Sequence, residues 1–158
     1  EGSLNTGKNR VEGIELGLAG NLTDRLSVQA GLAVLNAEVL DSVIASNEGK
    51  TLANFADKSA SLQLRYQATS AFSFGGTATY ESARYVGQPD TAANEDLGVP
   101  SYTVYDAFAT YQVNRDLKFR ANISNLFNKD YYLAAYRSGS FVYIGDKRSA
   151  QLTMEYSF

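Results

Sequence analysis

The chain has no cysteine, no histidine and no tryptophan, and only two prolines, among its 158 residues. Without cysteine there can be neither a disulfide framework nor a thiolate metal site. Without histidine, the side chain that most often serves as a general base and as a metal ligand is missing. The net charge of -3 and the pI near 4.9 exclude the basic surface that a nucleic-acid partner requires. We therefore expect no enzyme activity, with no catalytic residue, no bound cofactor and no metal site.

Long hydrophobic runs are also missing, since no window approaches the roughly 20 consecutive apolar residues of a membrane-spanning helix. A slightly negative mean hydropathy does not distinguish a soluble β protein from a transmembrane barrel, whose strands alternate apolar and polar residues. Abundant tyrosine and glycine with little proline favour β structure. The only methionine is Met154, so we expect Glu1 not to be a translational start and the chain to be processed or partial.

Alternation of apolar and polar residues predicts seven strands. The pattern is regular in the last ten residues, where Leu152, Met154, Tyr156 and Phe158 take every second position. The other predicted strands cover residues 8–22, 26–34, 60–67, 72–81, 102–113 and 117–124. The faces of residues 102–113 are the least distinct, because apolar residues interrupt the polar side. Gly75 and Gly76, in the middle of a strand, are expected to relieve crowding or to allow curvature.

Short and long connections alternate along the chain. Short turns are predicted near residues 23, 69 and 115, and long loops over residues 41–57, 86–101 and 128–147. Strands of ten or more residues, with short turns at one rim and long loops at the other, are typical of transmembrane barrels. The apolar face near the short turns carries an aromatic girdle of Tyr66, Phe72, Phe74, Tyr111, Tyr156 and Phe158. We therefore predict an all-β, antiparallel, up-and-down transmembrane β-barrel fold with a wet polar lumen.

Several segments carry a resemblance to a known family. They are Gly-Lys-Asn-Arg-Val-Glu-Gly-Ile-Glu-Leu at residues 7–16, Leu-Thr-Asp-Arg-Leu-Ser-Val at 22–28, Pro-Ser-Tyr-Thr-Val-Tyr-Asp at 100–106, Asn-Leu-Phe-Asn-Lys-Asp-Tyr-Tyr at 125–132, and the terminal Phe158. Together they resemble the last part of the barrel of TonB-dependent outer-membrane receptors of the siderophore-receptor type, over the whole chain. The resemblance implies an active importer in the bacterial outer membrane, with the C-terminus periplasmic and the long loops extracellular.

An odd number of strands leaves two open edges, which are not tolerated in lipid. We therefore expect residues 1–158 to form the C-terminal part of one barrel domain, about the last seven strands of a 22-stranded barrel. The resemblance implies partners outside these residues: the remaining barrel and plug, TonB through an N-terminal segment, and outer-membrane lipid. It also implies that the barrel assembly machinery recognises the terminal strand through Leu152, Met154, Tyr156 and Phe158.

Aromatic and cationic residues gather at the predicted long-loop rim. They are Arg84, Tyr85, Tyr131, Tyr132, Tyr136, Arg137, Tyr143, Lys147 and Arg148. Cations attract an anionic chelate, while tyrosines stack on its rings and donate hydrogen bonds. These residues are candidate contacts for a ferric siderophore, with the catecholate type favoured and iron present only within the transported chelate. The same residue types also occupy the interfacial girdle of any membrane barrel and meet lipid headgroups there.

Other functions remain open from the residues alone. A small self-contained or oligomeric outer-membrane barrel acting as a scaffold or adhesin would need an eighth strand in residues 41–56 or 128–147, or pairing of the open edges between copies. A soluble β-barrel binding protein has a similar pattern. An outer-membrane enzyme is disfavoured by the lack of histidine. The acidic residues Asp90, Glu95 and Asp96 match no calcium-loop spacing and are expected to be solvated.

Overall fold

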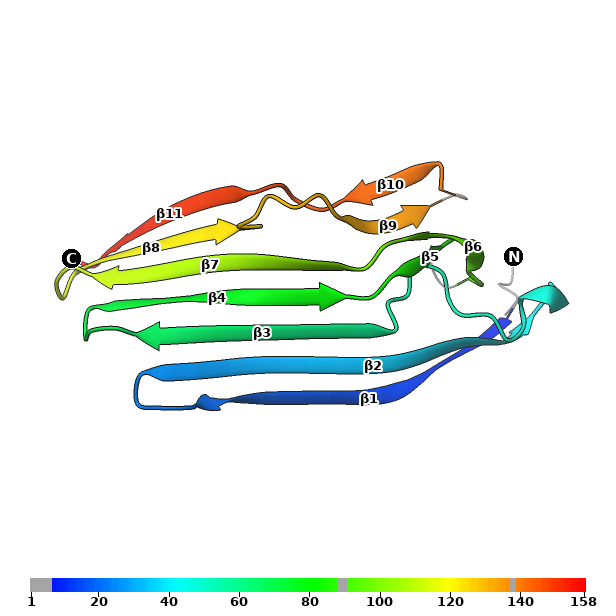
Figure 1. Ribbon diagram of the computed structural model, residues 1–158, viewed down its shortest axis with the longest axis horizontal. Helices are drawn as coiled ribbons and strands as arrows, with labels where there is room; N and C mark the ends of the chain where they lie inside the picture. The colour runs from blue at the N-terminus through cyan, green and yellow to red at the C-terminus, as the bar shows by residue number, and fades with distance from the viewer. Residues whose placement is uncertain (1–6, 88–90, 137–138) are drawn as a thin grey trace.

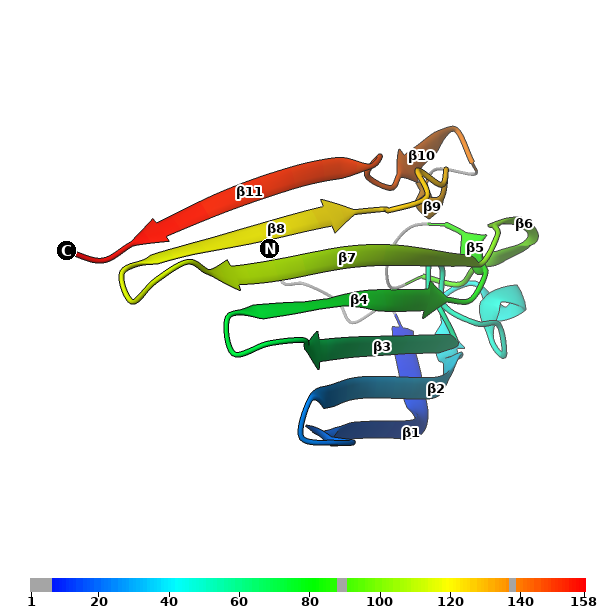
Figure 2. The same cartoon turned by 60° about the vertical axis from the view of Figure 1, so that its left-hand side comes forward.

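Seven long strands form a single antiparallel sheet in the computed structural model, which describes residues 7–87, 91–136 and 139–158. Their order is β1-β2-β3-β4-β7-β8-β11, side by side in one open layer (Figures 1 and 2). The bounds are β1 Gly7–Asn21, β2 Leu26–Ser42, β3 Lys58–Gln67, β4 Phe72–Glu81, β7 Tyr102–Gln112, β8 Leu117–Ser124 and β11 Ser149–Tyr156. The seven predicted strands and the three short turns between them are confirmed.

The predicted long loops contain additional structure. β5 Arg84–Val86 pairs with β6 Asn94–Val99, β9 Tyr132–Tyr136 pairs with β10 Phe141–Ile144, and Ala45–Asn47 form the 3-10 helix η1. Both hairpins lie at the end of the sheet opposite the short turns and the C-terminus (Figure 1). Each is a separate two-stranded sheet, so within the described residues neither adds an eighth strand to the main sheet.

Strand β2 continues to Ser42, well past the predicted end at Val34. Its outer part alternates in the opposite phase, because Leu35, Ala37 and Val39 place apolar side chains on the face that is polar nearer the short turn. Ala37 and Val39 are buried against Leu52, which comes from the loop before β3. A loop that folds over the polar face therefore accompanies a locally apolar stretch of that face, and the change of phase after Val34 breaks the pattern by which the strand was predicted.

Cross-strand pairing places the predicted apolar residues of all seven strands on one face. Directly paired residues of an antiparallel sheet lie on the same side. One row across five strands is Leu18, Ala30, Leu62, Ala78 and Tyr105, and a second across four strands is Phe72, Tyr111, Phe119 and Met154. This register resolves the faces of β7. The face is open to its surroundings, with Leu16 at 64% and Leu152 at 71% exposure.

The opposite face is polar. One row across six strands is Ser27, Arg65, Gly75, Phe108, Asn122 and Gln151. Charges on this face of β8 and β11 are paired between the two strands: Lys118 Nζ lies 2.8 Å and an Arg120 nitrogen 3.1 Å from the Glu155 carboxylate. The sheet thus has one face suited to lipid and one suited to water, as the alternation predicts.

Gly75 confirms the expected relief of crowding. A Cβ at this position would lie 2.1 Å from the Leu64 carbonyl oxygen and 2.6 Å from the Phe108 ring. Phe108 is the direct cross-strand partner of Gly75, so its ring occupies the space that a side chain would need. A larger residue would have to displace backbone atoms of β3.

The sheet does not close on itself. Within the described residues, β1 pairs with β2 alone and β11 pairs with β8 alone, which leaves two open edges. Buried residues are few and lie mainly at the long-loop end. In the described part of the chain, no helix is long and apolar enough to cross a membrane.

Candidate ligand-binding rim

The three long loops pack together over the end of the sheet. Ala37, Val39 and Leu52 form one buried cluster, and Val86, Val99 and Ala135 form a second from β5, β6 and β9. Residues 51–53 and 91–93 are joined by backbone hydrogen bonds, from Ala53 N to Thr91 O at 2.8 Å and from Ala93 N to Thr51 O at 2.9 Å. The loops therefore share a small core of their own.

Asn54 joins these loops through its side chain. Its Nδ2 donates to the carbonyls of Gly87 (2.9 Å) and Ala135 (3.0 Å), and its Oδ1 accepts from the Ala135 amide at 3.0 Å. Its own amide donates to the Tyr85 carbonyl at 2.8 Å. The backbone has φ = 55°, a left-handed conformation that asparagine tolerates better than most residues. One residue thus fixes three segments that are distant in sequence.

Asn125 has the same role at the connection between β8 and β11. The residue is 2% exposed, and its Nδ2 donates to the carbonyls of Lys129 (2.8 Å) and Asp146 (2.9 Å). Its Oδ1 accepts from the Lys129 amide at 2.8 Å, and its own amide donates to Asp106 Oδ1 at 2.8 Å. Asn128 adds a bond from the Arg148 amide at 3.0 Å. The Asn-Leu-Phe-Asn motif therefore holds the chain where it enters the last strand.

A cavity of about 220 Å³ opens on the polar face, at the long-loop end of β4 and β7. It is lined by Thr79, Tyr102, Val104, Asp106, Ser124, Asn125, Tyr131, Leu133 and Asp146. The ring centroids of Tyr102 and Tyr131 lie 4.7 Å apart with an angle of 44° between the planes, a tilted aromatic contact. The Tyr131 ring also fills the space that a side chain on Gly145 would need, since a Cβ there would lie 2.1 Å from it.

Arg84 supports this cavity from the side. Its guanidinium lies 6.0 Å from the centre of the Tyr102 ring, pairs with Glu81 and donates to the Leu133 carbonyl. The side chain is only 13% exposed. Arg84 is therefore held by three elements, and its charge is balanced by Glu81 instead of being offered to solvent.

The structure distributes the remaining predicted rim residues over two places. Tyr136 and Tyr143 share one face of the β9–β10 hairpin, opposite the buried Ala135, and Tyr132 and Tyr85 are exposed on β9 and β5. Lys147 and Arg148 lie at the base of the rim, in the connection to β11, where Lys147 pairs with Asp130. Arg137 lies outside the described residues.

Of the nine residues that line the cavity, Tyr131 alone was predicted as a contact, and the others include Tyr102, Asp106 and Asp146. Tyr102 and Asp106 belong to the Pro-Ser-Tyr-Thr-Val-Tyr-Asp segment, but position in a motif does not reveal which side chains converge. Together the walls of the cavity combine two tyrosine rings, phenolic hydroxyls that can donate hydrogen bonds and the carboxylates of Asp106 and Asp146, which can accept them. Such a lining is suited to a ligand with planar rings and polar substituents.

Comparisons with known proteins agree with this architecture. A family model described as "TonB dependent receptor-like, beta-barrel" matches residues 2–126. The chain is 36% identical over 158 residues to the probable TonB-dependent receptor BfrD of Bordetella pertussis, covering 96% of this chain and 21% of BfrD. It is 33% identical over 157 residues to the catecholate siderophore receptor Fiu of Escherichia coli K12, and this match covers 96% of this chain and 20% of Fiu.

Solved structures give the same result. The siderophore receptor PiuA of Acinetobacter baumannii superimposes with a TM-score of 0.82 at 29% identity, over 95% of this chain and 22% of PiuA. The closed form of the ferric-catecholate import receptor Fiu of E. coli K12 superimposes with a TM-score of 0.77 at 30% identity. The match covers 96% of this chain and 21% of Fiu.

The chain therefore belongs to the β-barrel family of TonB-dependent receptors, and the resemblance described above is confirmed. It forms a portion of such a barrel, and its relatives include siderophore receptors. The chain spans about a fifth of the length of these curated relatives.

Proposed function

We propose that this chain is the C-terminal part of the barrel of a TonB-dependent importer in the bacterial outer membrane, which takes up a ferric siderophore. The C-terminus and short turns face the periplasm and the long loops face outward. The remaining strands and the plug of the same receptor complete the lumen, and TonB acts through a segment outside these residues. The observation that carries the proposal is the seven-stranded, two-faced sheet with open edges and a tyrosine-lined cavity at its long-loop end.

The open edges support a larger barrel over a small closed one. Backbone groups at an unpaired edge cannot be satisfied in lipid, so β1 and β11 require partner strands. A self-contained barrel would require an eighth strand in the main sheet, whereas β9 and β10 pair only with each other in the described residues. The polar inner face, with charges paired across β8 and β11, is compatible with a hydrated plug.

A catecholate ligand is the substrate class that we favour. The partly exposed ring of Tyr131 can stack on a catechol ring, and the buried Tyr102, held by Arg84, supports it from behind. Fiu, at 33% identity, is described as a catecholate siderophore receptor. Iron enters only as part of the chelate, so the protein itself needs no cofactor.

Replacing Tyr131 by Ala in the complete receptor is expected to weaken binding of an iron(III) tris-catecholate by up to about tenfold, because a stacked aromatic pair contributes about 0.5 to 1.5 kcal/mol. Tyr131→Phe keeps the ring and should lose less. Binding is measured by quenching of intrinsic fluorescence, and import by uptake of radioactive iron. Tyr111→Ala, on the apolar face near the short turns, is the matched control. Equal affinity in Tyr131→Ala and wild type would remove this residue from the site.

The alternate apolar residues at the end of the chain, Leu152, Met154, Tyr156 and Phe158, are proposed to carry the assembly signal. Leu152, Met154 and Tyr156 lie on the apolar face of β11, whose outer edge is open, and Phe158 follows fully exposed. Such a strand is suited to strand addition by the barrel assembly machinery.

Replacing Tyr156 and Phe158 together by Ala should lower the amount of folded receptor in the outer membrane about tenfold or more, since burying each aromatic side chain contributes roughly 1.5 to 3 kcal/mol. Folded receptor is measured by its heat-dependent shift on gels. Thr153→Ala, on the polar face of the same strand, is the control and should assemble normally. Normal assembly of the double variant would argue against the signal.

A further inference from the structure

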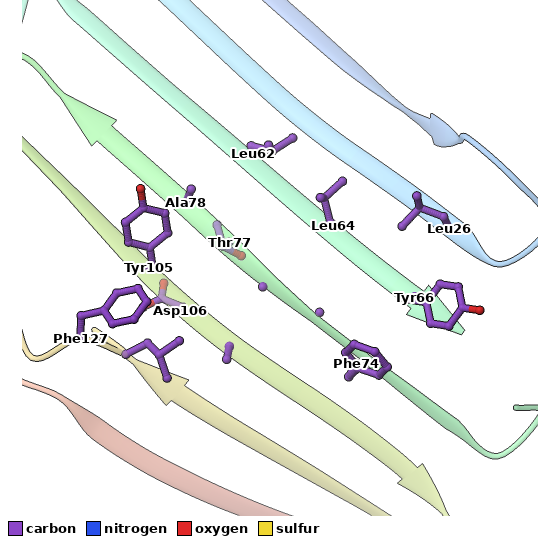
Figure 3. A pocket seen from close by; sticks show the side chains of 14 residues that line it. Leu26, Leu62, Leu64, Tyr66, Phe74, Thr77, Ala78, Tyr105, Asp106 and Phe127 are labelled. Atoms are coloured by element: carbon purple, nitrogen blue, oxygen red, sulfur yellow. The ribbon is translucent and has the colours of Figure 1, made fainter. Parts of the chain in front are cut away.

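The apolar outer face contains a groove of about 480 Å³ over β3, β4 and β7 (Figure 3). Its floor is made by small residues, because Gly76, Ala78 and Ala107 stand where neighbouring positions carry leucine, phenylalanine or tyrosine. Leu62 and Leu64 of β3 form one wall. The depression therefore arises from the register, which brings the small residues of β4 and β7 side by side.

Aromatic pairs close both ends of the groove. Tyr66 and Phe74 meet edge to face at 5.8 Å at the end near the short turn, and Tyr105 and Phe127 meet edge to face at 5.5 Å at the other end. Phe127 reaches this position because the Leu126 amide bonds to the Tyr105 carbonyl at 2.7 Å. The result is a bounded site, distinct from the continuous apolar surface around it.

The dimensions of the groove match one leaflet of a bilayer. Four residues of β4 separate Phe74 from Ala78, about 13 Å along the strand at 3.3 Å per residue. If the strand is tilted by about 40° from the membrane normal, this length spans about 10 Å along the normal. Half of the roughly 25 Å apolar band of an outer-membrane barrel is about 12 Å, which is close to that span. Phe74 lies two residues after the end of the short turn, so the groove occupies the short-turn half of the band.

The chemistry of the groove selects a hydrocarbon. The side chains that face it are apolar except for the tyrosine hydroxyls, while the lining residues Thr77 and Asp106 alternate onto the opposite, polar face. A peptide or sugar would leave polar groups unpaired against such walls. An apolar trough of about 480 Å³ and single-leaflet depth is suited to one alkyl chain, and Tyr66 stands at its interfacial end.

We propose that this groove is a binding site for one acyl chain of a phospholipid in the periplasmic leaflet. The acyl chain enters the groove beside Tyr66 and Phe74, and its methyl end lies against Tyr105 and Phe127. The inference rests on the outer-membrane placement and orientation proposed above, and it adds a specific lipid site to them.

The test uses the complete receptor in phospholipid nanodiscs that contain a phosphatidylethanolamine with a diazirine in the middle of one acyl chain. After illumination, labelled peptides are mapped by mass spectrometry. We expect adducts several-fold enriched at Tyr66, Phe74, Tyr105 and Phe127 over Leu152 and Met154 on the same face. Filling the groove with Ala78→Leu and Ala107→Leu should abolish the enrichment. Ala121→Leu, on the same face outside the groove, should leave it unchanged.

Even labelling over the whole face would overturn the proposal, as would enrichment that persists in the filled variant. Enrichment only with a diazirine on lipid A, or crosslinks between two receptor copies at these residues, would also overturn it, in favour of the other leaflet or of an oligomer contact. The labelling pattern of the wild-type receptor tests the proposal even if the variant with Ala78→Leu and Ala107→Leu fails to fold. Siderophore uptake does not enter this readout, so a receptor that imports another substrate can still confirm the lipid site.

Discussion

Replacing Asn125 by Ala is expected to lower the free energy of unfolding of the barrel by about 3 to 5 kcal/mol, more than any other single truncation considered for this chain. Three side-chain hydrogen bonds to backbone groups would be lost, each contributing about 1 kcal/mol, and buried backbone partners would be left unsatisfied. The left-handed backbone, with φ = 48°, costs a further 1 kcal/mol or so for alanine. Because the bond to the Asp146 carbonyl holds the entry to β11, the last strand should detach first.

Variants at the same position separate these contributions. Asn125→Gly keeps the backbone conformation and should lose only the hydrogen bonds, whereas Asn125→Asp keeps the acceptor for the Lys129 amide and loses the two donors. Unfolding is followed by calorimetry of the complete receptor in detergent. Asn122→Ala, on the exposed polar face of β8, is the matched control. A loss below about 1 kcal/mol for Asn125→Ala would mean that the turn is held by other contacts.

Replacing Asn54 by Ala is expected to release the long loops while leaving the sheet intact. The side chain joins the ends of β5 and β9 by three hydrogen bonds, which together oppose local opening by about 3 kcal/mol. Hydrogen exchange of the Ala135 amide should therefore accelerate roughly 100-fold, since about 1.4 kcal/mol corresponds to a factor of ten. Affinity for the catecholate probe should fall as well, because the rim would no longer be preorganised.

The thermal midpoint of the barrel should shift little in Asn54→Ala, because the bonds of Asn54 lie outside the seven-stranded sheet. Asn54→Asp retains the acceptor for the Ala135 amide and should give an intermediate exchange rate. Asn47→Ala serves as the control in the same loop, since the recorded bonds of Asn47 use its backbone. Unchanged exchange at Ala135 in Asn54→Ala would show that the apolar clusters alone hold the loops.

Tyr131 and Arg84 illustrate why only part of the site was predictable. Their residue types indicated an aromatic and cationic rim, and the structure places Tyr131 in the wall of the cavity and Arg84 beside the Tyr102 ring. Arg84 also makes contacts that its residue type does not indicate, because Glu81 balances its charge and Leu133 accepts its hydrogen bond. Those partners come from β4 and the segment around β9, and their approach depends on how the loops fold.

The sequence contains no pattern that predicts the role of Asn54, apart from the general tolerance of asparagine for a left-handed backbone. Its bonds connect positions 33 and 81 residues away in sequence, which no local pattern encodes. Asn125 was singled out only through a family motif, and the reason for the motif became visible in its four hydrogen bonds.

The sequence by itself determined the seven strands, the short turns, the apolar and polar faces and hence the family, because an alternation of period two is a local property of a strand between two unlike solvents. Only the tertiary structure decided the length of β2, the packing of the loops around Asn54, the contact between the Tyr102 and Tyr131 rings and the groove beside Gly76. Each of these depends on register and on contacts between distant segments, which are set by the pairing of whole strands and not by neighbours in the chain.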